Sequence, residues 1–272
     1  MNKVLELIIN LNLIEAIDAA AVVISTFLLV SEQLKFFPLV SAFFSTLFLY
    51  SLNRISDLKE DRINIPDRFK FWSKYGDKII FLTLIFFVIV TLSNFFIGFY
   101  QGFFLLLPFF IVFSYSFLRL KSVLFLKNIV VATGWSLIPL YASTYMVSPQ
   151  LSIIFFSSFV VFLSVLINAI VFDIKDIIGD KIVGVKTIPS VYGISPSKKL
   201  AYLLNIMLLF FILSAIFVFK IVSVNFSFLL FLPLFISLYI SILNPRNAYI
   251  LSECVANLDM IILLLLCVVS KI

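Results

Sequence analysis

Nine runs of about 20 mostly apolar residues, the length that crosses a bilayer as a helix, restrict this chain more than any other feature. The runs lie near residues 13–30, 35–53, 78–98, 101–118, 127–147, 151–172, 199–219, 225–243 and 249–270. Of the 272 residues, 63% are hydrophobic and 12% are charged, too apolar a balance for a water-soluble domain. We therefore expect an all-α integral membrane protein, because hydrocarbon offers backbone groups no partners outside a helix.

A single transmembrane domain is expected over residues 1–272, with about nine helices around a central cavity open toward the cytoplasmic side. Residues 1–10 are predicted as a short interfacial helix rather than a signal peptide, since Lys3 is their only basic residue. The two longest polar segments, 54–77 and 173–198, are expected to be loops that cap the cavity on the cytoplasmic side.

The basic residues are distributed unevenly between the two predicted membrane faces. If the N-terminus is cytoplasmic, the outer segments carry only Lys35, Lys220 and Lys271 of the 20 Lys and Arg residues. Because cytoplasmic segments are enriched in Lys and Arg, we expect a multi-pass protein of the cell (plasma) membrane with a cytoplasmic N-terminus. The net charge of +6 then belongs to one membrane face in contact with lipid, and no nucleic-acid partner is expected.

Two acidic motifs lie at the cytoplasmic ends of the second and sixth runs. The first contains Asn53, Asp57 and Asp61, and the second contains Asp173, Asp176 and Asp180. A step of four residues rotates a helix position by only about 40°, so each motif is expected to form one stripe on a helix. The shared D-x-x-x-D spacing suggests two related halves that meet at a cytoplasmic-side cavity. Several carboxylates in a chain without histidine favour Mg²⁺, or Mn²⁺, over zinc or copper.

Basic residues surround both motifs. They are Arg54, Arg62, Arg68, Lys70, Arg119, Lys121, Lys181 and Lys186. Such residues neutralise phosphate oxygens that a metal ion leaves uncompensated. Beside a lipid-filled interior, this combination predicts a substrate with a diphosphate head and a long apolar tail. Solvated membrane anchors are the alternative for these charges, although anchors on the inner face should be basic rather than acidic.

At these residues the sequence resembles the UbiA superfamily of membrane prenyltransferases. The first family signature, N-x-x-x-D-x-x-x-D, is matched by Asn53, Asp57 and Asp61 and continues through Asn64, Pro66 and Arg68. The second, D-x-x-D-x-x-x-D followed by G-x-K-T-x-P, is matched by Asp173, Asp176, Asp180, Gly184, Lys186, Thr187 and Pro189. A third, Y-x-x-x-K, occurs as Tyr115 to Arg119, with Arg in place of Lys.

The resemblance implies Mg²⁺-dependent transfer of an isoprenyl group from a prenyl diphosphate, such as geranyl or geranylgeranyl diphosphate, to a lipophilic acceptor. Pyrophosphate leaves and an allylic carbocation is captured by the acceptor. The resemblance assigns metal binding to Asn53, Asp57, Asp61, Asp173, Asp176 and Asp180. It assigns catalytic roles to Asp57, Asp61, Asp176, Asp180 and Tyr115. It assigns diphosphate or prenyl binding to Asn53, Arg68, Arg119, Lys186, Asp173 and Asn168.

Several departures from the family pattern concern the acceptor side. Asn168 and Ala169 stand where many members have Arg-Glu, and FKFWSKYG follows Arg68 in place of a small turn. Other polar residues that fall within predicted spans are Glu15, Asp18 and Asp259. Asp18 and Asn168 are candidates for shaping the acceptor pocket, with interhelical hydrogen bonding as the alternative.

Two other functions compete with prenyl transfer. A cation-coupled secondary transporter should carry its acids near the bilayer midplane, often beside broken helices. A CDP-alcohol phosphotransferase should carry a D-G-x-x-A-R element, which this sequence lacks. The acceptor is left open between a glycerol-phosphate lipid, a quinone-ring precursor and a chlorophyll-like or haem-like ring.

Overall fold

The computed structural model describes residues 3–117, 123–244 and 246–271, and within these ranges the chain is helical without a strand. The longer helices are α2 (Leu13–Val30), α3 (Phe36–Ser56), α5 (Pro66–Ile97), α6 (Phe99–Phe117), α7 (Leu126–Ser143), α8 (Leu151–Lys175), α11 (Ile194–Leu213), α12 (Phe231–Ile242) and α14 (Asp259–Val269). The shorter ones are α1 (Lys3–Asn10), α4 (Leu58–Asn64), α9 (Ile177–Val183), α10 (Ile188–Tyr192) and α13 (Ala248–Ile250). The expected all-α class is confirmed.

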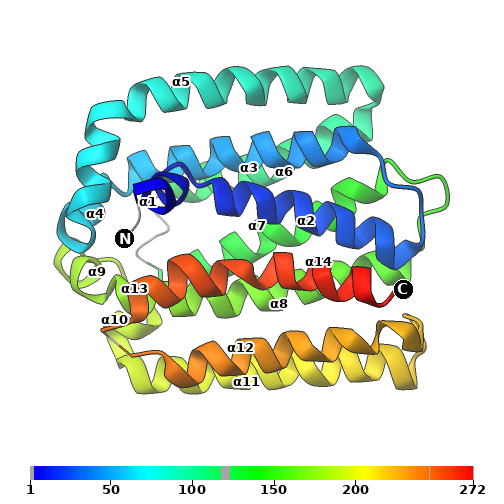
Figure 1. Cartoon of the computed structure of the whole chain (residues 1–272). Helices are drawn as coiled ribbons and strands as arrows, with labels where there is room; N and C mark the ends of the chain where they lie inside the picture. Colours follow the sequence, from blue (N-terminus) through cyan, green and yellow to red (C-terminus); the bar gives the residue numbers. More distant parts are fainter. Residues whose placement is uncertain (1–2, 118–122, 245, 272) are drawn as a thin grey trace.

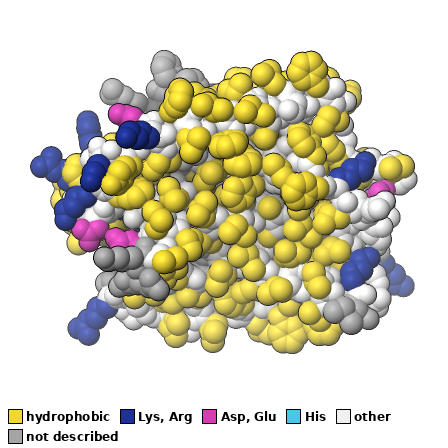
Figure 2. Space-filling model, turned by 45° about the horizontal axis from the view of Figure 1, so that its top comes forward, with side chains coloured by type: hydrophobic (Ala, Val, Ile, Leu, Met, Phe, Trp, Pro, Cys, Tyr) yellow, Lys and Arg dark blue, Asp and Glu magenta, His cyan; other side chains and the backbone are white. Residues whose placement is uncertain are grey.

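Seven helical segments of the described chain are long and apolar enough to cross a membrane. They are Leu13–Val30, Phe36–Ser56, Pro66–Ile97, Leu151–Lys175, Ile194–Val218, Val224–Ile242 and Ala248–Val269. Figure 2 shows a broad apolar surface between two ends that carry the charged side chains. The chain is therefore a multi-pass membrane protein. Helices α6 and α7 lie in the other two predicted ranges, and the total of nine spans stays a prediction.

The long helices run side by side, and the short helices α1, α4, α9, α10 and α13 gather at one end of the bundle (Figure 1). Helix α8 is the most buried candidate span, with 72% of its most apolar window inside the protein, whereas α5 is the least buried at 28%. Helices α3 and α8 lead into the short helices α4 and α9, which contact each other at the polar end of the bundle.

The segments predicted as capping loops are largely helical, which corrects that expectation. In the first segment, α4 is followed after one residue by α5, whose first residue is Pro66, a favoured position for proline. In the second, α9 is followed by α10, where Thr187 and Ser190 form a reciprocal capping box. Hydropathy did not detect these helices because they are polar and short.

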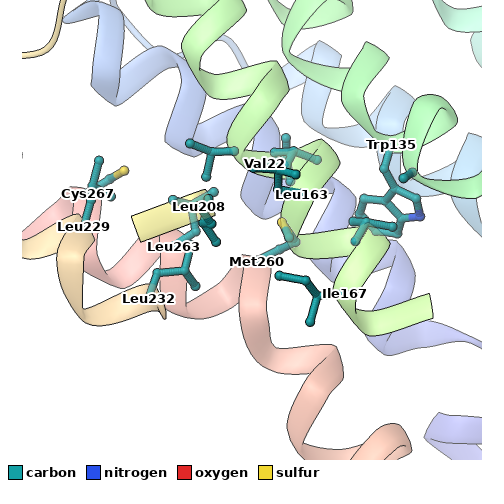
Figure 3. Packing of buried hydrophobic residues seen from close by; sticks show 14 of the residues in the cluster. Val22, Trp135, Leu163, Ile167, Leu208, Leu229, Leu232, Met260, Leu263 and Cys267 are labelled. Atoms are coloured by element: carbon teal, nitrogen blue, oxygen red, sulfur yellow. The ribbon is translucent and has the colours of Figure 1, made fainter. Parts of the chain in front are cut away.

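Apolar packing joins the C-terminal helices to α8. Leu208, Leu229, Leu232, Leu263 and Cys267 meet where α11, α12 and α14 come together (Figure 3). Close side-chain packing is the main apolar contribution to helix association in a membrane, because lipid is as apolar as the side chains. This core packs α11 against α8 and α14 against α2, and the turns before α14 (Leu251–Val255 and Ala256–Leu258) contact α8 beside the polar end.

Candidate active site

Asp57 occupies a bend between α3 and α4. Its backbone has φ −99° and ψ 8°, so the first motif does not lie on the single continuous helix that the spacing predicted. The hydrogen bonds from Asp57 N to Asn53 O (3.0 Å) and from Asp61 N to Asp57 O (2.8 Å) nevertheless keep a helical pattern through the bend. The chain changes direction while the three motif side chains stay on one side.

Asp176 occupies the matching bend between α8 and α9. Its φ of −97° and ψ of 3° are close to those of Asp57, and Asp180 N donates to Asp176 O at 2.9 Å. Helices α4 and α9 both have seven residues and both carry a buried aspartate, Asp61 or Asp180, in the first turn. The two motifs therefore share one local structure, as the repeated spacing suggested.

Asn64 joins the two motifs directly. Its Nδ2 donates to Asp176 O at 3.3 Å, and its Oδ1 accepts from Gly179 N at 2.8 Å. A Cβ atom at Gly179 would lie 2.3 Å from Asn64 Nδ2, so only glycine permits this close approach. The polar ends of α4 and α9 are thus held against each other.

One cavity of about 260 Å³ lies between these elements. Its mouth is lined by all the acidic-motif residues, Asn53, Asp57, Asp61, Asp173, Asp176 and Asp180. Its apolar walls include Phe104, Leu105, Pro108, Val131, Trp135 and Ile138. A charged mouth and an apolar interior in the same cavity suit a ligand with a polar head and a long hydrocarbon tail.

Arg68 is buried, with 2% of its surface exposed, and each of its three guanidinium nitrogens donates to a carboxylate. Its Nε and Nη2 donate to the two oxygens of Asp61 at 3.0 and 2.7 Å, and its Nη1 donates to Glu253 at 3.0 Å. Such a two-pronged contact fixes the position and orientation of the Asp61 carboxylate. The direct role of Arg68 in diphosphate binding stays a prediction, since in this state its donors orient the protein's own acids.

Glu253 links the two motifs and was not singled out from the sequence. It is completely buried, and its Oε1 accepts from Arg68 and, at 3.0 Å, from Lys175, which lies 3.4 Å from Asp176. It sits in a π-helical turn, Leu251–Val255, a distortion that is often found at functional sites. An acid at the inner end of an apolar run was the only available indication of its importance.

The second motif draws its positive charge from α7. Asp173 accepts from Lys127 Nζ at 3.0 Å and from Asn128 Nδ2 at 2.8 Å. Asp180 accepts only from Thr187 among the hydrogen bonds of the described chain, at 3.1 Å. Burial raises the pKa of Asp180 to about 7 although Lys127 opposes this, so the carboxyl takes up a proton near neutral pH. Lys127 and Asn128 were missed as site residues because they begin a predicted span and read as its anchor.

The donor set at the mouth fits a hard divalent cation that shares its ligands with a bound phosphate. Among the described residues, no three acids, cysteines or histidines lie close enough to hold an ion by themselves. Mg²⁺ usually takes one or two carboxylates and completes its octahedron with water and phosphate oxygens. Asp176 Oδ1 is buried and has no hydrogen-bond partner in the described chain. A buried oxygen without a partner is unusual, and this one is available as a ligand for such a cation.

Of the remaining predicted site residues, one lines the cavity, one does not, and two are not described at the side-chain level. Asn168 lines the cavity, farther from the mouth than the motifs. Lys186 is exposed and is not among the cavity-lining residues, although its neighbours Val185 and Thr187 reach the site. Arg119 and the side chain of Tyr115 lie outside the part of the chain that the structure describes.

The chain resembles known proteins over most of its length. It matches the UbiA prenyltransferase family over residues 19–250. It is 30% identical to a digeranylgeranylglyceryl phosphate synthase from Methanosphaera stadtmanae over 157 residues, which is 57% of either chain. The alignment thus spans little more than half of that curated relative.

Two solved structures share the fold. A digeranylgeranylglyceryl phosphate synthase superposes with a TM-score of 0.65 at 20% identity, over 100% of both chains. The apo structure of a UbiA homologue from Aeropyrum pernix K1 superposes with a TM-score of 0.65 at 14% identity, over 94% of this chain and 95% of the other. With the family match covering helices α3 to α12 and both acidic motifs, this protein belongs to the UbiA prenyltransferase family.

Proposed function

We propose that the protein transfers an isoprenyl group from a prenyl diphosphate to a lipophilic acceptor, with Mg²⁺ or Mn²⁺ as cofactor. One observation carries the proposal: two acidic motifs from distant parts of the chain bracket the mouth of a single apolar-walled cavity. The family match and the curated synthase relative support the same activity. Geranyl or geranylgeranyl diphosphate is the donor class that this cavity and these relatives favour.

The residues at the mouth have different roles in binding the diphosphate: some hold the divalent cation and others orient its ligands. Asp57 and Asp176, at the two bends, are the carboxylates through which a divalent cation would be held, with Asp61, Asp173 and Asp180 around them. Asn53 donates to Asp57 Oδ2 at 2.9 Å and so orients it. Bound Mg²⁺ would supply the positive charge that neutralises the diphosphate oxygens.

The chemical step needs charge stabilisation rather than a strong base. The bond between the C1 carbon of the isoprenyl group and the diphosphate oxygen breaks, and its electron pair leaves with pyrophosphate. Lys127 and Lys175, both at the cavity wall, are positioned to stabilise the negative charge that develops on the leaving group. The apolar walls keep water away from the allylic cation until the acceptor attacks C1. The acceptor then loses a proton, which the released pyrophosphate can take up.

Location and orientation are part of the proposal. The end that carries α4, α9 and α10 (Figure 1) is proposed to face the cytoplasm of a cell whose plasma membrane holds the protein. Most basic residues of the sequence belong to the segments that the positive-inside rule places on this side. Lys35, Lys220 and Lys271 belong to segments at the opposite end.

Product analysis tests the proposed activity. Purified protein in lipid nanodiscs is offered geranyl and geranylgeranyl diphosphate with a panel of lipid, quinone-precursor and ring acceptors, and products are identified by mass spectrometry. We expect pyrophosphate release and a prenylated product that EDTA abolishes and excess Mg²⁺ restores. Absence of any diphosphate chemistry with every donor would refute the proposal.

Secondary transport remains the competing function because three acids, Glu15, Asp18 and Asp259, lie within candidate spans and line the cavity. The motifs at the mouth are better explained by phosphate chemistry, since a transporter has no need for paired acidic bends beside Lys127 and Lys175. Uptake of labelled solutes into liposomes, driven by a proton or sodium gradient and without turnover of prenyl diphosphate, would favour transport.

A further inference from the structure

The same cavity has a second polar region away from its mouth, the inner cluster, formed by Glu15, Asp18, Asn168 and Asp259. On α8, Asn168 precedes Asp173 by five residues, about 7.5 Å along the helix, so the cluster lies deeper in the bundle. All its members line the cavity, and the exposed fractions of Glu15, Asp18 and Asp259 are 4%, 3% and 1%. None of them belongs to the acidic motifs.

Hydrogen bonds and an ion pair satisfy Glu15 and Asp259 only in part. Glu15 Oε1 lies 3.8 Å from Arg54 Nη2 and 3.5 Å from Asn257 Nδ2. The Tyr239 hydroxyl lies 3.2 Å from Asp259 Oδ2 and 2.6 Å from Asn168 Oδ1. These contacts hold the inner cluster in place.

One carboxyl oxygen of each acid has no hydrogen-bond partner in the described chain. Glu15 Oε2, Asp18 Oδ1 and Asp259 Oδ1 are buried and have no hydrogen-bond partner within the described chain. Buried polar atoms without partners are rare in proteins, and ionisable groups inside a membrane usually face a ligand or a partner. Three such oxygens, on residues that line the same cavity, therefore indicate a ligand that donates hydrogen bonds.

The charge and spacing of the acids restrict that ligand further. Among the described residues, no three acids are grouped closely enough to coordinate a metal ion. Asp18 interacts electrostatically with Glu15 and with Asp259, and the nearby Arg54 is already paired with Glu15, so the cluster offers an anionic head no free counter-charge. A neutral head with hydroxyl donors meets both conditions.

We propose that the inner cluster is the acceptor subsite and selects acceptors by a neutral, hydroxyl-bearing head. The proposal rests on the proposed prenyl transfer, in which the donor's diphosphate occupies the mouth and the acceptor needs a separate place in the same cavity. The free oxygens of Asp18, Glu15 and Asp259 accept hydrogen bonds from the head, and Asn168 is held beside them by Tyr239.

The test measures binding of three probes that share one hydrocarbon chain: monoolein with two hydroxyls, methyl oleate with none, and the anion oleate. Native mass spectrometry of the purified full-length protein gives the occupancy of each probe without any prenyl diphosphate. We expect monoolein to bind about tenfold more tightly than methyl oleate, the equivalent of one or two hydrogen bonds, and oleate to bind worst. Equal affinities, or a preference for oleate, would overturn the proposal.

Two substitutions at one position and a matched control separate recognition from damage to packing. Asp18→Asn and Asp18→Leu should reduce the preference for monoolein over methyl oleate to less than about threefold. Asn205→Leu removes an equally buried polar group of α11 that donates to Pro233 O and Ser237 of α12 and does not line the cavity, and it should keep the wild-type preference. Loss of the preference in the control as well as in the Asp18 variants would assign the effect to packing.

Two further outcomes distinguish this proposal from the proposed function. Because the binding test contains no donor, hydroxyl selectivity without prenyl transfer would refute the enzyme activity and leave the subsite intact. Conversely, prenyl transfer with no hydroxyl selectivity would keep the activity and refute the subsite. Tighter binding of oleylamine than of monoolein would show that the inner cluster takes cations, which also overturns the proposal.

Discussion

The two acidic motifs have nearly the same backbone but are neutralised in different ways. Asp57 and Asp176 bend the chain with φ and ψ values that agree within a few degrees, and a seven-residue helix follows each bend. Asp61, in the first motif, is held by both prongs of Arg68. Its counterpart Asp180 has only the Thr187 hydroxyl as a hydrogen-bond partner in the described chain, and its pKa is raised to about 7.

The difference indicates which motif has more need of an added cation. The first motif is compensated by an arginine a few residues away on α5, whereas the second relies on Lys127 and Asn128 of α7 and on Lys175 of α8. Among the described residues, one oxygen of Asp176 still has no hydrogen-bond partner. Metal binding is therefore expected to begin at the second motif. Substitutions in and beside the two motifs should show which of their features are shared and which differ.

The largest effect is expected from the aspartates at the bends. Asp57→Asn and Asp176→Asn should each lower pyrophosphate release about 10²- to 10³-fold, because each removes a carboxylate that holds the charge-stabilising cation. Asp176→Asn should also raise the Mg²⁺ concentration needed for half-maximal rate more than Asp57→Asn does. Titration of Mg²⁺ against initial rate measures this, and wild-type turnover in either variant would contradict the assignment.

Glu253→Gln should disconnect the two motifs. Removing the carboxylate charge leaves the buried cations Arg68 and Lys175 less well neutralised, which should lower the free energy of unfolding by roughly 3 kcal/mol. Turnover should fall roughly 10- to 100-fold, because these residues support the metal-binding carboxylates. Thermal unfolding in detergent and pyrophosphate release measure the two effects. Adding Lys175→Met to Glu253→Gln should destabilise less than the sum of the single changes, and strict additivity would argue against a shared network.

Gly179→Ala should separate α4 from α9. The new methyl group would meet Asn64, and overpacking of this kind costs about 1–3 kcal/mol. Gly134→Ala is the matched control, since a Cβ there meets nothing within 4 Å. Thermal unfolding of both variants checks the prediction. A combined Asn64→Ala and Gly179→Ala variant should recover part of the loss, and unchanged stability of Gly179→Ala alone would show that the close approach is not needed.

Asp67→Asn should have the smallest effect. Asp67 pairs with Lys70 at 3.0 Å beside the first motif, but both side chains are about three-quarters exposed, at 77% and 74%. Exposed pairs contribute little, so the free energy of unfolding should change by no more than about 0.5 kcal/mol and turnover should be unaltered. A large loss of activity would show that Asp67 acts in the site, and that exposed acids beside the motifs contribute as the motif acids do.

Local patterns were sufficient to predict much of this protein. Hydropathy located the long helices and the membrane class, and the intervals within each motif identified six side chains that all line the cavity mouth. Those inferences succeed because helix periodicity and bilayer thickness act on neighbouring residues. The same reasoning mistook the polar capping segments for loops, since hydropathy carries no information on helices that lie outside the lipid.

The partners of the motif residues were decided by the tertiary structure alone. Glu253 reaches Arg68 across 185 positions of sequence, and Lys127 meets Asp173 only because α7 packs on α8. In the sequence these residues are indistinguishable from charged ends of membrane helices. Periodicity specifies which face a side chain occupies, but only the packing of helices distant in sequence specifies which charge it meets.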